Sequence, residues 1–143
     1  MKNNKGKKIK IVSLFIMLLT VLCIGTSMVA SAQQTSSLNI RNYQINSYTT
    51  ESEKRTATNV NNAWKILMTE TGEKQGTITT FWLAEKTSHS QLSKGVDVGL
   101  SKEYTYTSAY SSASGKTVVI GAENNTWNSE NYDITFKWAA QSE

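Results

Sequence analysis

Apolar and polar residues alternate along much of the chain, and this period of two constrains the fold more than any other feature of the sequence. The clearest example is YDITFKW at residues 132–138, where every second side chain is large and apolar. Residues 64–68, 96–100 and 118–122 repeat the pattern. Successive side chains of a β-strand point to opposite faces, so each segment is expected to be a strand with one buried face.

Three more segments bring the expected total to about seven short strands. Residues 37–48 alternate but change phase after Ile40, as a bulge or corner requires. Residues 104–110 align tyrosines, and residues 77–84 are apolar on both faces, which is typical of a central strand or of one with a second covered face. No segment carries a sustained helical stripe. We therefore expect an all-β fold, a small antiparallel β-sandwich, with a small barrel as the alternative.

Two stretches lack a clear pattern. Residues 49–62 are polar, and they are expected to form either a mobile surface loop or, as we favour, a short edge strand marked by Thr56, Thr58 and Val60. Residues 33–37 are expected to be a disordered stub. The remaining chain, 38–143, has the length of a single domain.

The first 32 residues have the layout of a secretory signal peptide. Five lysines precede an apolar run at residues 11–24, and Ala30 and Ala32 supply the small-x-small pattern of a cleavage site. The run is shorter than the roughly 20 residues of a membrane-spanning helix. Cys23 follows Leu22 rather than the small residue that a lipid anchor needs. We expect cleavage after Ala32, a secreted product and no stable membrane anchor.

Removal of the leader changes the charge of the protein. Residues 33–143 contain ten basic and eleven acidic side chains, a net charge of −1, so the basic precursor gives no support for nucleic-acid binding. They contain no cysteine, which excludes a disulfide and a thiol nucleophile. This composition is typical of exported proteins of Gram-positive bacteria.

The sequence offers little catalytic or metal-binding chemistry. His89 is the only histidine. A catalytic triad or a zinc site would need it, but one histidine without cysteine leaves too few good ligands, and an exposed, non-catalytic role is expected. The acidic pairs are expected to be solvated side chains. The polar stretch 123–131 has oxygen ligands but not the spacing of a calcium loop, so we favour a plain turn. We expect no enzyme activity, no cofactor and no metal.

The aromatic residues are the most informative candidates for ligand contact. Trp127 has polar neighbours on both sides, and it is expected either to mark an exposed recognition loop or to fold back over the core. Trp82 is intermediate, and the tyrosine row forms either a core ladder, as we favour, or an exposed stacking face. The candidate ligand-binding residues are Trp127, Trp82, Asn125, Tyr104 and Tyr106.

Three stretches of the chain resemble a family of small uncharacterised secreted proteins of Bacillus and related Gram-positive bacteria. They are NNAWKI (61–66), GTITTFWL (76–83) and AYSSASGKTVVIGAENNTWNSENYDITFKW (109–138). That family has a domain-of-unknown-function label. The chain is also more loosely similar to lactococcin-like bacteriocins. This resemblance implies a cysteine-free β-sandwich protein made with a signal peptide.

These observations lead to one expected function and two alternatives. We expect a secreted, non-enzymatic, bacteriocin-like protein that acts at the cell envelope, where its partner is a lipid or a wall glycan. The first alternative is a carbohydrate- or cell-wall-binding module. The second is an extracellular structural or interaction protein whose partner is another protein.

Overall fold

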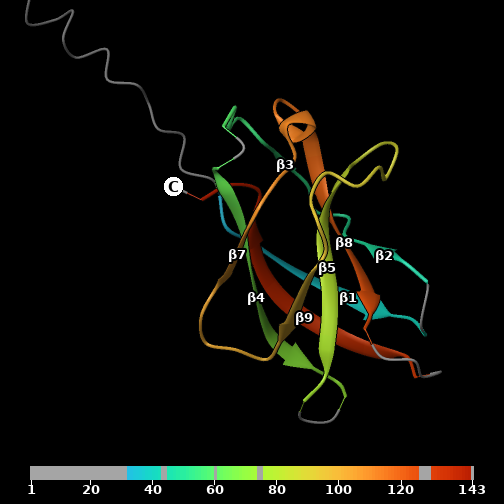
Figure 1. Cartoon of the computed structure of the whole chain (residues 1–143). Helices are drawn as coiled ribbons and strands as arrows, with labels where there is room; N and C mark the ends of the chain where they lie inside the picture. Colours follow the sequence, from blue (N-terminus) through green and yellow to red (C-terminus); the bar gives the residue numbers. More distant parts are fainter. Residues whose placement is uncertain (1–31, 43–44, 60, 74–75, 126–129, 143) are drawn as a thin grey trace, which may run out of the picture.

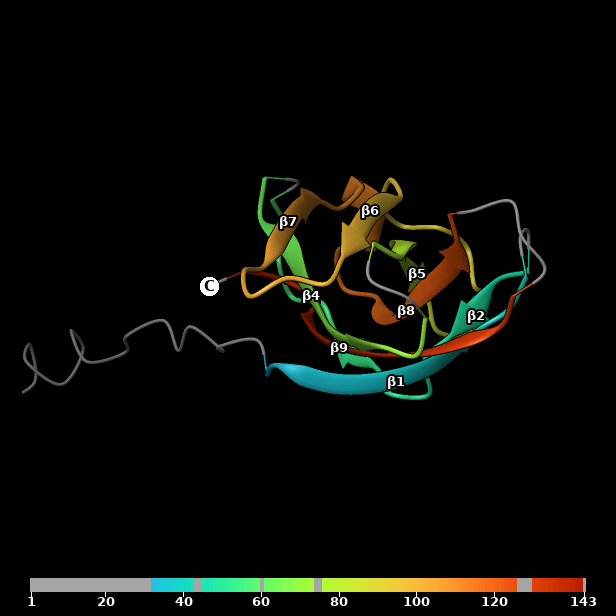
Figure 2. The ribbon, with the colours of Figure 1, turned by 90° about the horizontal axis from the view of Figure 1, so that it is seen from below.

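The structure, a computed structural model, describes residues 32–42, 45–59, 61–73, 76–125 and 130–142. It is all-β, with two antiparallel sheets that form a sandwich-like fold, which confirms the expected class (Figures 1 and 2). The described residues form nine strands: β1 (Gln34–Ile40), β2 (Ser47–Tyr48), β3 (Glu53–Lys54), β4 (Ala63–Thr71), β5 (Ile78–Glu85), β6 (Val96–Gly99), β7 (Thr105–Ser108), β8 (Thr117–Asn124) and β9 (Tyr132–Ala139). Their helical content is one 3₁₀ turn, Ser111–Ala113.

The four-stranded sheet has the order β1-β9-β4-β7, and the five-stranded sheet has the order β2-β8-β5-β6 with β3 also paired to β8. Figure 2 shows β1, β9 and β4 in one layer and β5, β6 and β8 in the other. The change of phase after Ile40 corresponds to the passage of the chain from β1 in the first sheet to β2 in the second. Strands β1 and β2 are therefore edges on the same side of the sandwich.

The core lies between the two sheets and is filled by the alternating positions. Along β9, Ile134, Phe136 and Trp138 are buried, as the period of two predicts. Phe136 meets Phe81 of the opposite sheet with their ring centroids 5.1 Å apart. The inward faces of the two sheets thus share one hydrophobic cluster.

Strand β5 is a central strand with two buried faces, as its sequence predicts. It pairs with β8 on one side and β6 on the other. Phe81 and Leu83 belong to the core between the sheets, whereas Trp82 and Ala84 form a second, smaller cluster with Val119 on the outer face.

The expectation of a disordered stub is wrong for residues 34–37. They form the first half of β1 and pair with residues 135–138 of β9. Ser36 is buried, and its hydroxyl accepts a 3.0 Å hydrogen bond from the indole nitrogen of Trp138. The segment is ordered by backbone pairing and by this hydrogen bond. It contains no large apolar residue from which a strand could be predicted.

The expectation of an edge strand at residues 56–60 is also wrong. The short strand in this region is β3, two residues earlier, and residues 55–59 are not in a strand; Val60 lies outside the described residues. The side-chain amide oxygen of Gln141 accepts hydrogen bonds from the backbone N–H groups of Thr56 and Ala57 at 3.0 and 2.8 Å. These bonds replace a strand partner for the segment.

Arg55 fixes the same segment to the end of the chain. Its side chain is only 1% exposed, and its guanidinium donates hydrogen bonds to the backbone carbonyls of Ala140 and Asn62. Beside it, the carboxylate of Glu53 accepts a 2.8 Å hydrogen bond from the backbone N–H of Ala140. Burial lowers the pKa of Arg55 and the charge of Glu53 opposes this shift, so the guanidinium remains charged at neutral pH.

We expect Arg55→Met to lower the free energy of unfolding by about 3 kcal/mol, because one buried and one partly buried carbonyl lose their donors and Glu53 loses a nearby positive charge. Urea unfolding of the purified chain measures this loss. The matched control is Lys54→Met, an exposed neighbour that should change stability by no more than about 0.5 kcal/mol. Equal stability of the two variants would contradict this role of Arg55.

Candidate functional site

Tyr104 and Tyr106 lie together at the edge of the four-stranded sheet, beside Lys65. The two rings are tilted with their centroids 6.4 Å apart, and the ammonium of Lys65 lies 5.2 Å from the centroid of the Tyr104 ring. The Tyr106 side chain is 57% exposed and Tyr104 is half-buried. We call Lys65, Tyr104 and Tyr106 the tyrosine face. The favoured expectation of a core ladder is wrong for these two tyrosines, since neither belongs to the hydrophobic core.

The register of β4 explains why these side chains meet. Lys65 pairs directly with Tyr106 of β7, and paired residues of antiparallel strands project from the same face. Trp64 and Ile66, on either side of Lys65, point into the core, so Lys65 and Tyr106 point away from it. Burial raises the pKa of Tyr104, and the neighbouring Tyr106 raises it further, so the Tyr104 hydroxyl is a hydrogen-bond donor at neutral pH.

Trp82, the second aromatic candidate, is buried on the outer face of the five-stranded sheet. It is 6% exposed and lies against Gly121 of β8, its register partner. A Cβ atom at Gly121 would be 2.4 Å from two atoms of the indole. The ring of Tyr48 meets the indole edge-on, with a centroid distance of 6.2 Å and an angle of 88°. Trp82 therefore offers little surface for stacking and supports Tyr48 instead.

His89 completes this outer aromatic group. Its ring stacks on that of Tyr48, with centroids 3.9 Å apart and planes 6° from parallel. His89 has a φ of 55°, which is uncommon for a residue other than glycine. Its backbone N–H donates to the carbonyl of Glu85, whose own N–H donates to the carbonyl of Ser90, both at 2.9 Å. This closed turn holds the imidazole over Tyr48, and His89 is exposed, as expected.

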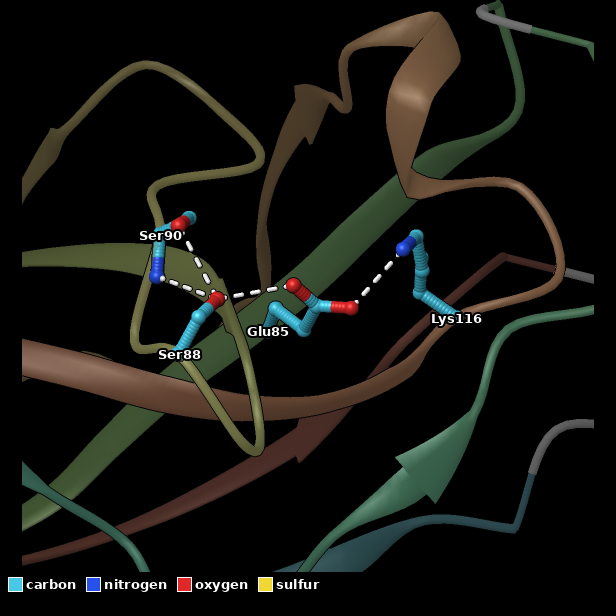
Figure 3. Close-up of polar contacts among 4 residues, drawn as sticks. All are labelled: Glu85, Ser88, Ser90 and Lys116. Atoms are coloured by element: carbon cyan, nitrogen blue, oxygen red, sulfur yellow. Dashed lines mark hydrogen bonds and ion pairs between the residues drawn. The ribbon is translucent and has the colours of Figure 1, made fainter.

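Side-chain contacts of Glu85 strengthen the turn (Figure 3). Its carboxylate accepts hydrogen bonds from the ammonium of Lys116 at 2.8 Å and from the hydroxyl of Ser88 at 2.7 Å. Ser88 also accepts a hydrogen bond from the backbone N–H of Ser90 at 3.2 Å. The bonds from Lys116, and then from Ser88, lower the pKa of Glu85, so the carboxylate is charged at neutral pH. The last residue of β5 is thereby joined to the residue before β8 at the base of the turn.

A groove of about 400 Å³ opens where the edge strands β1 and β2 meet. The hydroxyl of Ser47 in β2 donates a 2.8 Å hydrogen bond to the carbonyl of Asn39 in β1, and so ties the two sheets together. The amide of Asn46 donates to the Tyr48 hydroxyl at 3.4 Å. The residues that line the groove are Leu38, Asn39, Arg41, Asn46, Ser47 and Tyr48. Sequence reasoning did not find this site; the change of phase after Ile40 was its only local signal.

Of the remaining candidates, Trp127 lies outside the described residues, and Asn125 does not lie with the tyrosine face. Asn125 is exposed directly after β8 of the five-stranded sheet, whereas Tyr104 and Tyr106 lie at the edge of the four-stranded one. Of the two cleavage-site residues, Ala32 is exposed before β1 and Ala30 is outside the described residues.

Two negative findings apply to the described parts of residues 32–142. They contain no group of three or more His, Cys, Asp or Glu side chains arranged to hold a metal ion. They also contain no helix with the length and apolar character needed to cross a membrane.

Comparison with known proteins places the chain in a family. A family model described as "Protein of unknown function (DUF2712)" matches residues 26–142. The chain belongs to this family. The DUF2712 match includes all nine strands, the tyrosine face and the groove. No curated protein and no solved structure matches the chain.

We expect Gly121→Ala to lower the free energy of unfolding by about 2 kcal/mol, because the added methyl would overlap the indole of Trp82. The matched control is Gly99→Ala in β6, where the nearest atom to a new Cβ is the Thr77 carbonyl oxygen at 3.5 Å, an ordinary contact. Urea unfolding measures both variants. If Gly121→Ala is as stable as the control, Trp82 does not depend on the bare backbone at position 121.

Proposed function

We propose that this protein is a secreted, non-enzymatic binding protein of the Gram-positive cell envelope, and that the tyrosine face binds a wall glycan. The observation that carries the proposal is the arrangement of two adjacent tyrosine rings, one of them 57% exposed, with a lysine ammonium beside them. The side chains come from β4, β7 and the residue before β7.

The chemistry of this face suits a sugar better than a purely apolar ligand. The C–H face of a sugar ring packs against an aromatic ring, while tyrosine hydroxyls hydrogen-bond to its hydroxyl groups. The ammonium of Lys65 supplies a positive charge for an acidic group on the same polymer. An exposed sheet edge with these groups can accept a long chain without a deep cleft.

Secretion is part of the proposal and rests on the signal-peptide layout of residues 1–32. The fold is compatible with cleavage after Ala32, since β1 begins at Gln34 and would remain whole. The net charge of −1 on residues 33–143 then leaves local features, rather than overall charge, to select the ligand.

A bacteriocin-like action on the membrane is the second candidate function. The leader and the looser similarity to lactococcin-like bacteriocins support it, as do the large apolar side chains that face solvent. Ile78 and Leu100 are 42% and 49% exposed, respectively, and such side chains suit contact with lipid. This candidate shares the envelope location but differs in its target, a lipid rather than a glycan.

The processed protein should begin at Gln33, because a signal peptidase cuts after the second small residue of Ala30-Ser31-Ala32. Intact-mass measurement of the protein recovered from culture medium tests this. Recovery of the full 143-residue chain from the membrane fraction would contradict both the cleavage and the secretion.

We expect Tyr106→Ala to weaken binding to purified cell walls about tenfold, the effect of losing roughly 1.4 kcal/mol of aromatic contact. The measurement is co-sedimentation of residues 33–143 with walls, protoplasts and intact cells in parallel. Tyr110→Ala is the matched control, since Tyr110 is an exposed tyrosine outside the tyrosine face and its loss should leave binding unchanged.

Three outcomes of the co-sedimentation are distinct. Saturable binding to walls that Tyr106→Ala weakens supports the wall-glycan proposal. Binding to protoplasts with growth inhibition supports the bacteriocin-like candidate instead. A protein that stays in the supernatant with all three fractions contradicts both and directs attention to a soluble protein partner.

A further inference from the structure

The groove between β1 and β2 carries a cation that has no counter-ion among the described residues. Arg41 is the one charged side chain among the six that line it. No residue in the described parts of the chain forms an ion pair or a hydrogen bond with the Arg41 side chain. A guanidinium presents several N–H donors in a planar fork that matches a carboxylate or a phosphate.

The other lining groups suit the neutral part of a sugar. Asn46 and Ser47 supply amide and hydroxyl groups, while Leu38 and Tyr48 supply apolar surface. The side-chain amide of Asn39 already donates a 2.9 Å hydrogen bond to the carboxylate of Asp133. The volume of about 400 Å³ lies within the roughly 300–1,000 Å³ of small-molecule sites. A groove with an aromatic wall and a few polar groups is expected to bind a sugar ring that bears a charged group.

The aromatic wall of the groove is held rigidly from outside. His89 covers one face of the Tyr48 ring, and Trp82 meets the ring edge-on. The left-handed backbone at His89 costs free energy, and such conformations persist where the surrounding structure imposes them, often at functional sites. The contacts of Glu85 with Lys116 and Ser88 secure the turn that imposes it (Figure 3). The whole network fixes one ring of the groove.

From these observations we infer that the groove is a ligand site for an anionic saccharide unit, a sugar that bears a phosphate or a carboxylate. Arg41 binds the anionic group, Asn46 and Ser47 bind sugar hydroxyls, and the ring edge and hydroxyl of Tyr48 contact the sugar. His89 is a positioning residue that acts through Tyr48.

This site is separate from the tyrosine face. Strands β1 and β7 are the opposite edges of the four-stranded sheet, with β9 and β4 between them. The inference therefore stands on its own residues, and either site could fail without the other.

The test is to titrate residues 33–143 with four ligands and to measure binding by calorimetry and by NMR. The ligands are glucose 1-phosphate, N-acetylmuramic acid, neutral N-acetylglucosamine and inorganic phosphate. We expect saturable binding of one or both anionic sugars and at least tenfold weaker binding of the neutral sugar and of phosphate alone. Whether the phosphate or the carboxylate sugar binds more tightly distinguishes the two sources of the charge.

Variants locate the binding. Arg41→Gln should weaken binding of the anionic sugar at least tenfold, whereas Lys54→Gln, which removes an exposed cation of the five-stranded sheet, should leave it unchanged. His89→Ala should weaken it severalfold and leave wall binding through the tyrosine face unchanged. Circular dichroism and urea unfolding confirm that each variant is folded.

Several results would overturn the inference. They are absence of saturable binding by every anionic sugar, equal binding of charged and neutral sugars, and equal binding of inorganic phosphate and glucose 1-phosphate. Loss of sugar binding in Tyr106→Ala but not in Arg41→Gln would assign the ligand to the tyrosine face. Failure of the wall-binding proposal, in contrast, leaves the titration with small sugars unaffected.

Discussion

The burial of both faces of β5 is the constraint on which the outer surface of the five-stranded sheet depends. Its inward residues join the common core, but Trp82 points outward and needs cover. Gly121 gives the indole a bare backbone to lie against, and the indole in turn gives the Tyr48 ring an edge to meet. Aromatic side chains bury roughly 150–250 Å² each, so this small cluster is a large part of the hydrophobic area outside the main core.

Local periodicity was enough to predict the strands that alternate, because side-chain direction in a strand depends only on neighbouring residues. It failed where order comes from distant partners. Arg55 bonds to a carbonyl 85 positions away, and Ser36 accepts a bond from Trp138, 102 positions away. The residue types near positions 34–37 and 55–59 do not indicate these bonds. The first segment was therefore expected to be disordered, and the second was assigned a strand that it does not form.

For the candidate site, too, local spacing predicted some features, and the features that depend on strand pairing were not predicted. Tyr104 and Tyr106 are two residues apart, so the sequence places them on one face, but period alone does not say which face is buried; their register with Lys65 decides it. The exposure of Trp82 could not be predicted without its pairing to Gly121. The groove was not predicted, since its lining residues come from β1, from β2 of the other sheet and from the connection between them, and they surround one space only through the fold.

The positions of the tyrosine face and the groove bear on the size of the ligand. Three interstrand spacings of about 4.8 Å separate the edges of the four-stranded sheet, so the tyrosines at β7 and the groove at β1 are about 14 Å apart across the sheet. One sugar ring cannot reach both, whereas a repeating polymer can. Once one repeat is bound, the second contact becomes intramolecular, and its effective concentration makes the combined affinity exceed that of either site. Two shallow sites that bind single sugars weakly are therefore compatible with firm attachment to a wall polymer.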